Sequence, residues 1–108
     1  MLMPMDGVRV VDLTRFTAGP FCTRILSDYG ADVIKIEEPG AGDPARRMPP
    51  FHKDDPDLEK SGVFLFLNTN KRSVTLNLRT EDGKSILKEL VKGADILVEN
   101  FSPGVMDG

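Results

Sequence analysis

The turn at residues 14–20 is the first place where this sequence could bind an anion. Thr17, Ala18 and Gly19 come immediately before a predicted helix, and the free amides and positive dipole end of a helix attract phosphate, carboxylate or thioester oxygens. The pattern alone favours a simpler interpretation, in which Gly19 and Pro20 only shape a tight strand-to-helix turn. The chain contains neither a GxGxxG fingerprint nor a P-loop.

Basic residues are paired at two further positions. Lys71 and Arg72 stand just before a predicted strand, where they could bind phosphate groups, although two adjacent cations more often form an ordinary solvated turn. Arg46 and Arg47 lie in a proline-rich loop whose aspartates could neutralise them. His52 lies among charges in the same loop, without a nucleophile or a metal-ligand companion, so we expect it to be exposed and assign it no role.

Asp12 and Cys22 each have a chemical and a structural interpretation. Asp12 follows an apolar strand, where it could be a buried carboxylate with a raised pKa, but its favoured role is to accept backbone or hydroxyl hydrogen bonds in the turn. Cys22 lies near the start of a predicted helix, where a thiolate would be stabilised, but the position better suits a small buried hydrophobe. Because no set of nucleophile, base and orienting group can be assembled, no catalytic residue is assigned in this chain.

Composition limits the classes of partner. The 108 residues are 40% hydrophobic and 29% charged, which predicts one compact core. With 14 basic and 17 acidic residues, the net charge of −3 argues against a broad surface for nucleic acid or anionic lipid. One cysteine and one histidine exclude an internal disulfide and a thiolate zinc cage, so no metal site is predicted. The chain shows neither a signal peptide nor an apolar run of membrane length, and we expect a cytoplasmic protein without a membrane partner.

The elements that would position these residues alternate between strand and helix. Four short β-branched or alternating segments are predicted strands: 8–13, 31–37, 73–78 and 95–99. Two segments have helical spacing: 21–29, with Pro20 to start it and Gly30 to stop it, and 81–92, with Thr80 and Gly93 as caps. Residues 38–60 are predicted to be a long irregular loop, and 62–67 could be a helical turn or a buried strand.

This order predicts an α/β fold with a partial Rossmann-like parallel sheet and flanking helices. Ligands of such sheets bind beyond the carboxyl ends of the strands, which singles out the turns at 14–20 and 100–104. Two clear helices are too few to cover both faces of about four strands. We therefore expect exposed apolar surface and further cover from outside residues 1–108.

Four sequence blocks together carry a more specific signal. They are LTRFTAGP at 13–20, GADVIKIE at 30–37, NKRS at 70–73 and ADILVENF at 94–101. In this order and spacing they closely resemble the N-terminal segment of the family III coenzyme A (CoA) transferases. The resemblance covers essentially the whole chain.

The resemblance implies that residues 1–108 form the N-terminal part of a large CoA-binding domain in a longer enzyme built as an interlocked homodimer. In such transferases an aspartate attacks an acyl-CoA thioester, and CoA then passes to an acceptor carboxylic acid. That aspartate would lie beyond this chain, so the chain alone is predicted to be inactive. CoA would be a substrate rather than a cofactor. A 2-methylacyl-CoA racemase or epimerase of the same family, or a CoA-binding module without catalysis, remain alternatives.

The resemblance also assigns binding residues. One turn would line the pantetheine arm and the thioester, a second segment would hold the adenine and phosphates, and a third would contact the pantetheine. In that order, the residues are Arg15, Phe16, Thr17 and Ala18; Leu76 and Arg79; and Asn100 and Phe101. Thr17, a possible thioester contact, stands where formyl-CoA transferase has glutamine. Glu38 and Gly108 stand where family members often carry basic residues, and the Glu38 carboxylate would repel a phosphate unless it turns away or the nucleotide binds differently.

Overall fold

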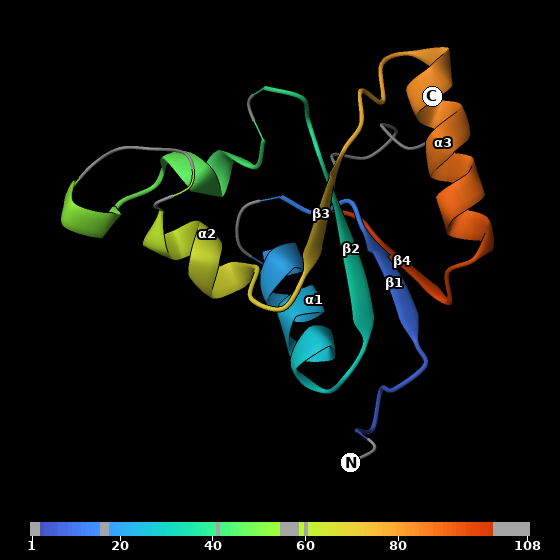
Figure 1. Ribbon diagram of the computed structural model, residues 1–108, viewed down its shortest axis with the longest axis horizontal. Coiled ribbons are helices and arrows are strands. Elements are labelled where there is room, and N and C mark those ends of the chain that lie inside the picture. The colour runs from blue at the N-terminus through green and yellow to red at the C-terminus, as the bar shows by residue number, and fades with distance from the viewer. Residues whose placement is uncertain (1–2, 16–17, 41, 55–58, 60, 101–108) are drawn as a thin grey trace.

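A parallel sheet of four strands forms the centre of the computed structural model, which describes residues 3–15, 18–40, 42–54, 59 and 61–100 (Figure 1). The strands are β1 (Arg9–Asp12), β2 (Asp32–Glu37), β3 (Arg72–Thr75) and β4 (Ile96–Val98). Their order across the sheet is β3-β2-β1-β4, and all neighbours are parallel. The predicted α/β class and its parallel sheet are confirmed, with each strand shorter than predicted.

The helices of the described part also follow the predicted order. They are α1 (Ala18–Asp28), α2 (Gly62–Leu67) and α3 (Glu81–Lys92). The structure decides the ambiguous segment 62–67 in favour of a helix, whose N-terminus is capped by Ser61. Thr80 and Gly93 cap α3 as predicted. The loop after β2 contains two short 3-10 turns, Pro44–Arg47 and His52–Asp54.

The helices lie on opposite faces of the sheet, as Figure 1 shows, with α3 on one side and α1 on the other. On the α3 face, Val11 and Ile34 pack with the partly buried Leu87 and Leu90. On the α1 face, Val10 and Val33 pack with Leu26. The two central strands, β1 and β2, thus bury both of their faces, as expected for a parallel sheet between helices, while β3 and β4 at the edges stay partly exposed.

The α1 face changes character along the strands. Side chains alternate between the two faces of a strand, so Asp12 follows Val10 on the α1 face of β1, and Lys35 and Glu37 follow Val33 on the same face of β2. All three charged residues are buried. The face is therefore apolar near the amino ends of the strands and ionic near their carboxyl ends.

This ionic half explains why α1 differs from its predicted orientation. Helical spacing predicts that Phe21, Cys22, Ile25, Leu26 and Tyr29 face the core, but only Leu26 packs against it, and the other four are exposed. The buried side of α1 instead carries Pro20, Thr23 and Ser27. Asp12 beneath the helix needs hydrogen-bond donors, and the Thr23 hydroxyl supplies one. The prediction that Cys22 is buried was wrong for the same reason.

Candidate functional site

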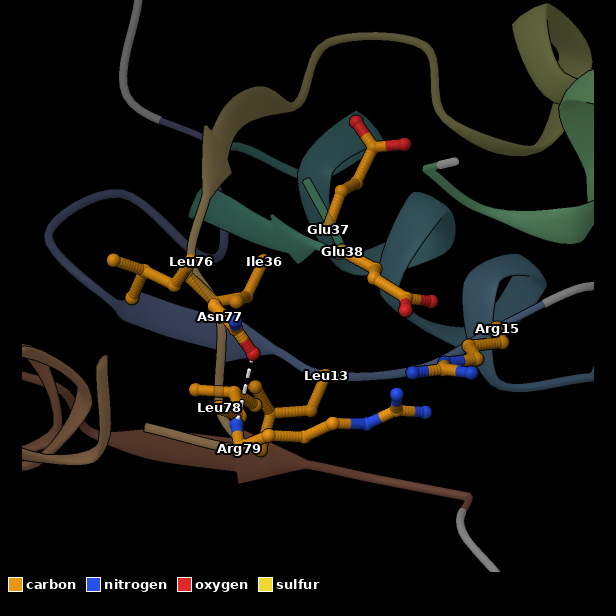
Figure 2. A pocket seen from close by; sticks show the side chains of 9 residues that line it. All are labelled: Leu13, Arg15, Ile36, Glu37, Glu38, Leu76, Asn77, Leu78 and Arg79. Atoms are coloured by element: carbon orange, nitrogen blue, oxygen red, sulfur yellow. Dashed lines mark hydrogen bonds between the residues drawn. The ribbon is translucent and has the colours of Figure 1, made fainter. Parts of the chain in front are cut away.

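An open, shallow depression lies at the carboxyl ends of β1, β2 and β3 (Figure 2). Apolar side chains form part of its wall, namely those of Leu13, Ile36, Leu76 and Leu78. Four charged residues line it: Arg15 after β1, Glu37 and Glu38 at the end of β2, and Arg79 after β3. The structure thus brings together Arg15, Leu76 and Arg79, three of the predicted binding residues. A depression with an apolar wall and two guanidinium groups has the chemistry to hold a ring and a phosphate side by side.

A tight turn between β3 and α3 presents Arg79. The Asn77 side chain accepts a hydrogen bond from the Arg79 amide at 3.1 Å, and the Asn77 carbonyl accepts one from the Thr80 hydroxyl at 2.8 Å. The same hydroxyl accepts from the Gly83 amide at 3.0 Å and so caps α3. Gly83 is buried against this turn, and a Cβ atom there would lie 1.9 Å from the Asn77 carbonyl oxygen. Close packing between the start of α3 and the turn therefore fixes where the Arg79 backbone lies.

Asn100 joins the turn after β4 to the turn after β1. Its side-chain oxygen accepts a hydrogen bond from the Arg15 amide at 3.0 Å, and its side-chain nitrogen donates to the Arg15 carbonyl at 2.9 Å. The residue predicted to contact pantetheine thus holds the backbone of another predicted binding residue. Ala18 is exposed at the start of α1, while Phe16, Thr17 and Phe101 lie outside the described residues.

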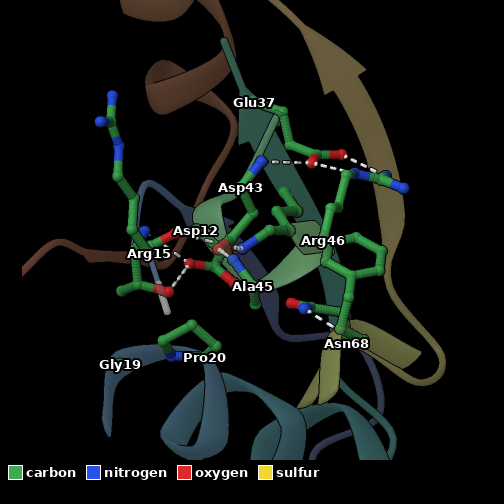
Figure 3. Close-up of polar contacts among 12 residues, drawn as sticks. Asp12, Arg15, Gly19, Pro20, Glu37, Asp43, Ala45, Arg46 and Asn68 are labelled. Atoms are coloured by element: carbon green, nitrogen blue, oxygen red, sulfur yellow. Dashed lines mark hydrogen bonds and ion pairs between the residues drawn. The ribbon is translucent and has the colours of Figure 1, made fainter. Parts of the chain in front are cut away.

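A buried carboxylate lies directly beneath this edge of the sheet (Figure 3). Asp12 accepts hydrogen bonds from the Thr14 amide at 2.8 Å, from the Thr14 hydroxyl and from the Thr23 hydroxyl at 2.7 Å. Lys71 lies 3.0 Å from the same carboxylate. Burial alone would raise the pKa of Asp12, but the positive charges of Lys35 and Lys71, together with the two hydroxyls, lower it below its usual value. The predicted hydrogen-bonding role of Asp12 is confirmed, and its pKa is lowered rather than raised.

Two lysines complete the buried network. The Lys35 ammonium lies 2.7 Å from the Asp43 carboxylate and donates to the Thr14 carbonyl at 3.1 Å. The Lys71 ammonium donates to the Pro20 carbonyl at 3.1 Å and to the Asn68 side chain at 2.7 Å. Burial lowers the pKa of Lys71, and the neighbouring Asp12 charge partly opposes that effect.

A second ionic cluster lies at the carboxyl end of β2, around Glu37. Both carboxylate oxygens of Glu37 are held by the Arg46 guanidinium, at 2.8 and 2.9 Å. The Ser73 hydroxyl and the Asp43 amide donate to the same carboxylate at 2.5 and 3.0 Å. Burial tends to raise the pKa of Glu37, but these hydrogen bonds and the Arg46 charge prevail and lower it to about 2. The Arg46 guanidinium also lies 3.7 Å from the centre of the Phe64 ring.

These contacts decide the roles of the paired basic residues. Lys71 is neither a solvated turn residue nor a residue of the depression, because its side chain is buried against Asp12. Arg72 pairs with Asp32 at the exposed edge of the sheet, at 2.5 Å. Arg46 pairs with Glu37, the last residue of β2. His52 is exposed, as predicted.

Two negative findings apply to the described part of the chain. No helix there has the length and apolar character needed to cross a membrane. No group of three or more histidine, cysteine, aspartate or glutamate side chains there is arranged to hold a metal ion.

Comparison with known proteins identifies the family. The model of the family described as CoA-transferase family III matches residues 5–108. The chain belongs to CoA-transferase family III. Curated relatives of this family III chain include the proteins named formyl-CoA:oxalate CoA-transferase from Escherichia coli O139:H28 and Shigella boydii serotype 18. Each is 48% identical over 107 residues, which cover 99% of this chain and 25% of the relative.

Solved structures of similar proteins agree with this family membership. A CaiB/BaiF family protein from Brucella suis superimposes with a TM-score of 0.87 at 39% identity, covering 99% of this family III chain and 28% of its own. The protein Rv3272 from Mycobacterium tuberculosis gives a TM-score of 0.83 at 42% identity, covering 97% of this chain and 27% of its own. The chain therefore spans about a quarter of the length of the relatives it matches.

Sequence reasoning missed the buried ions of this family III site. Lys35 stands in an apolar strand, between Ile34 and Ile36, and a lysine at a buried strand position is a signal for a buried partner. Lys71 carries no comparable signal, because the residues around it are polar. Its partner Asp12 could be found only from the order of the strands in the sheet.

Proposed function

We propose that this chain is the CoA-binding N-terminal part of a family III CoA-transferase that moves CoA between carboxylic acids. One observation carries the proposal: Arg15, Leu76 and Arg79, from segments far apart in sequence, line one depression at the carboxyl edge of the sheet. The names of the curated relatives support CoA transfer rather than racemisation. Residues 1–108 belong to the large CoA-binding domain, and the complete enzyme is a homodimer.

The residues of the depression match the parts of CoA. The Arg79 guanidinium forms charge-assisted hydrogen bonds with a CoA phosphate, and Leu76 packs against the adenine. Arg15 and Ala18, together with Phe16 and Thr17, contact the pantetheine arm, and Thr17 lies nearest the thioester. Asn100 and Phe101 contact the pantetheine from the turn after β4. Glu38 shares the depression with the two arginines, and its negative charge offsets part of the attraction for phosphate.

The reaction itself requires a carboxylate that this chain does not supply. An aspartate outside residues 1–108 attacks the thioester carbonyl, which forms a mixed anhydride and releases the CoA thiolate; the thiolate attacks the aspartyl carbonyl, releases the donor acid and leaves an aspartyl-CoA thioester. The acceptor carboxylate then attacks this thioester and releases CoA, and the CoA thiolate attacks the acceptor carbonyl of the new anhydride to give the product thioester and the free aspartate. The chain alone is therefore expected to bind CoA without transferring it. Incubation with an acyl-CoA and an acceptor acid should give no exchanged thioester. Turnover that depends on an aspartate of this chain would refute the assignment.

Arg79→Ala tests the binding site in the protein at its full encoded length. Loss of a charge-assisted hydrogen bond costs about 1.5 to 3 kcal/mol, which corresponds to CoA binding weakened by about 10-fold to 150-fold. Titration calorimetry measures the change for CoA and for dephospho-CoA. If Arg79 contacts the 3′-phosphate, the variant loses its preference for CoA over dephospho-CoA; if Arg79 contacts the diphosphate, both ligands weaken and the preference stays.

Glu38→Gln is the matched control, because it removes a charge of opposite sign from the same depression. This variant should bind CoA at least as tightly as the wild type, since a carboxylate near a phosphate is repulsive. Unchanged CoA affinity in both variants would show that the depression is not part of the CoA-binding site.

A further inference from the structure

Two buried lysines, one on β2 and one just before β3, hold backbone carbonyls after β1 and in the first turn of α1. The Lys35 ammonium, on β2, donates to the Thr14 carbonyl at 3.1 Å, after β1. The Lys71 ammonium, just before β3, donates to the Pro20 carbonyl at 3.1 Å, in the first turn of α1. The side chains of both lysines are only 1% exposed. These contacts fix two backbone oxygens, one on either side of Arg15 in the chain.

Asp12 connects the end of β1 with α1. Its Oδ1 atom accepts hydrogen bonds from the Thr14 amide and hydroxyl, and its Oδ2 atom accepts from the Thr23 hydroxyl of α1 at 2.7 Å. Oδ2 also forms the ion pair with Lys71 at 3.0 Å. One carboxylate thus contacts the end of β1, the second turn of α1 and the cation that precedes β3.

A gain in folding stability alone does not explain why Asp12, Lys35 and Lys71 are buried here. A buried ion pair is often no more stabilising than well-packed apolar side chains of similar volume, because the cost of desolvating two charges offsets their attraction. The same sheet face uses Val10 and Val33 a few residues earlier, so apolar packing is available to this fold. Ion pairs and charge-assisted hydrogen bonds differ from apolar contacts in being directional, and here they point at the backbone after β1 and in the first turn of α1.

We propose that Asp12, Lys35 and Lys71 are positioning residues that hold the Arg15 backbone and the first turn of α1 in their CoA-binding positions. This inference rests on the proposed function. The same strand links the two halves of the site, since Lys71 precedes β3 and Arg79 follows it. The network therefore sets the position of Arg15 relative to Arg79 without touching the ligand.

Lys71→Met tests the proposal in the protein at its full encoded length, with Arg72→Met as the matched control. Both variants remove one positive charge from adjacent residues, but Arg72 pairs with the exposed Asp32 instead of the buried network. We expect Lys71→Met to weaken CoA binding at least 10-fold and Arg72→Met to change it less than 3-fold. Equal losses in the two variants would mean that the overall charge, rather than the network, controls CoA binding, and would overturn the proposal.

Hydrogen exchange distinguishes positioning from a general loss of stability. In Lys71→Met the amides of Thr14 and Arg15 should exchange at least 10-fold faster, while those of α3 should keep their wild-type rates. A uniform acceleration throughout the sheet and α3 would show that Lys71 acts only on global stability, and would refute the positioning role.

A milder pair of variants keeps the test valid if Lys71→Met does not fold. Thr23→Val keeps the shape of the side chain but removes the hydroxyl that contacts Asp12, whereas Thr23→Ser keeps the hydroxyl. We expect CoA binding to weaken about 3-fold to 10-fold in Thr23→Val, less than for the direct contact of Arg79 because Thr23 acts only through Asp12, and to recover in Thr23→Ser. Identical affinities in the two Thr23 variants would contradict the proposal.

The outcomes separate this inference from the proposed function. If the wild-type protein does not bind CoA, the proposed function fails, whatever the variants do. If the wild type and Arg72→Met bind CoA and Lys71→Met and Thr23→Val bind it equally well, the proposed function stands and the positioning role fails.

Discussion

Replacing Glu37 with glutamine should remove a specific part of the acid sensitivity of this protein. Glu37 is 6% exposed, and its carboxylate accepts two hydrogen bonds from Arg46, one from Ser73 and one from the Asp43 amide. Glutamine has nearly the same shape, but it carries no charge, and its amide nitrogen cannot accept a hydrogen bond from Arg46. The substitution therefore replaces a carboxylate, whose two oxygens both accept hydrogen bonds, with a neutral amide whose NH2 group would face the Arg46 guanidinium.

The size of the effect follows from the lowered pKa of Glu37. A fall from 4.5 to about 2 on folding corresponds to about 3 kcal/mol of stability from the ionised form. Because the folded-state pKa is depressed, this stability is present above pH 4.5 and is lost as the pH falls toward about 2. Glu37→Gln should thus cost about 3 kcal/mol at pH 7, and the difference from the wild type should shrink to less than about 1 kcal/mol near pH 2.

Urea unfolding, followed by far-UV circular dichroism at several values between pH 7 and pH 2, measures this difference. Using the difference between the two proteins cancels the titration of other carboxylates that both retain. Glu38→Gln is the control, because it removes the same charge from the next residue outside the Arg46 hydrogen bonds, and it should cost less than about 0.5 kcal/mol at pH 7. Parallel stability curves for the wild type and Glu37→Gln between pH 5 and pH 2 would refute the reasoning.

Two further predictions concern packing. Gly83→Ala should destabilise the protein by about 2 kcal/mol in urea unfolding, because the new Cβ would lie 1.9 Å from the Asn77 carbonyl oxygen. Ser85→Ala, at an exposed position of the same helix, is the control and should not change the free energy of unfolding. Equal stabilities of the two variants would contradict the close contact at Gly83. The isolated 108-residue chain should associate through the exposed faces of α1 and α2, where Ile25 and Phe66 are 41% and 57% exposed. In sedimentation experiments, Phe66→Ser should weaken that association about 10-fold. A wild-type chain that stays monomeric at all concentrations would be evidence against this apolar surface as a contact.

The sequence determined the types of the elements because the signals for them are local. The caps of α3, Thr80 and Gly93, act within a few residues of their own positions, and the apolar residues of α3 repeat with the helical period between residues 86 and 91. The β-branched runs at 8–13 and 31–37, separated by one helix, predicted parallel strands because such a connection leaves few other topologies. This topology also predicted at which edge of the sheet the site lies, since the carboxyl ends of parallel strands point the same way. Arg15 and Arg79 both line the depression at that edge.

Only the tertiary structure decided which side of α1 is buried. The apolar pattern of α1 predicts an apolar partner, but the partner is the ionic half of the sheet, so Thr23 faces inward and Phe21 faces outward. Periodicity describes the helix alone and carries no information about the surface against which it packs.

The tertiary structure also determined the partners in the ionic network of Asp12, Lys35 and Lys71. The pairing of Asp12 with Lys71 depends on the order and register of β1, β2 and β3, which place two residues far apart in sequence within 3.0 Å. Residue type indicated that Asp12 accepts hydrogen bonds, because an ionised carboxylate offers acceptors and no donor. The identity of its cation could not be predicted, because an ion pair is defined by distance in space, and the sequence contains 14 lysines and arginines that have the required charge.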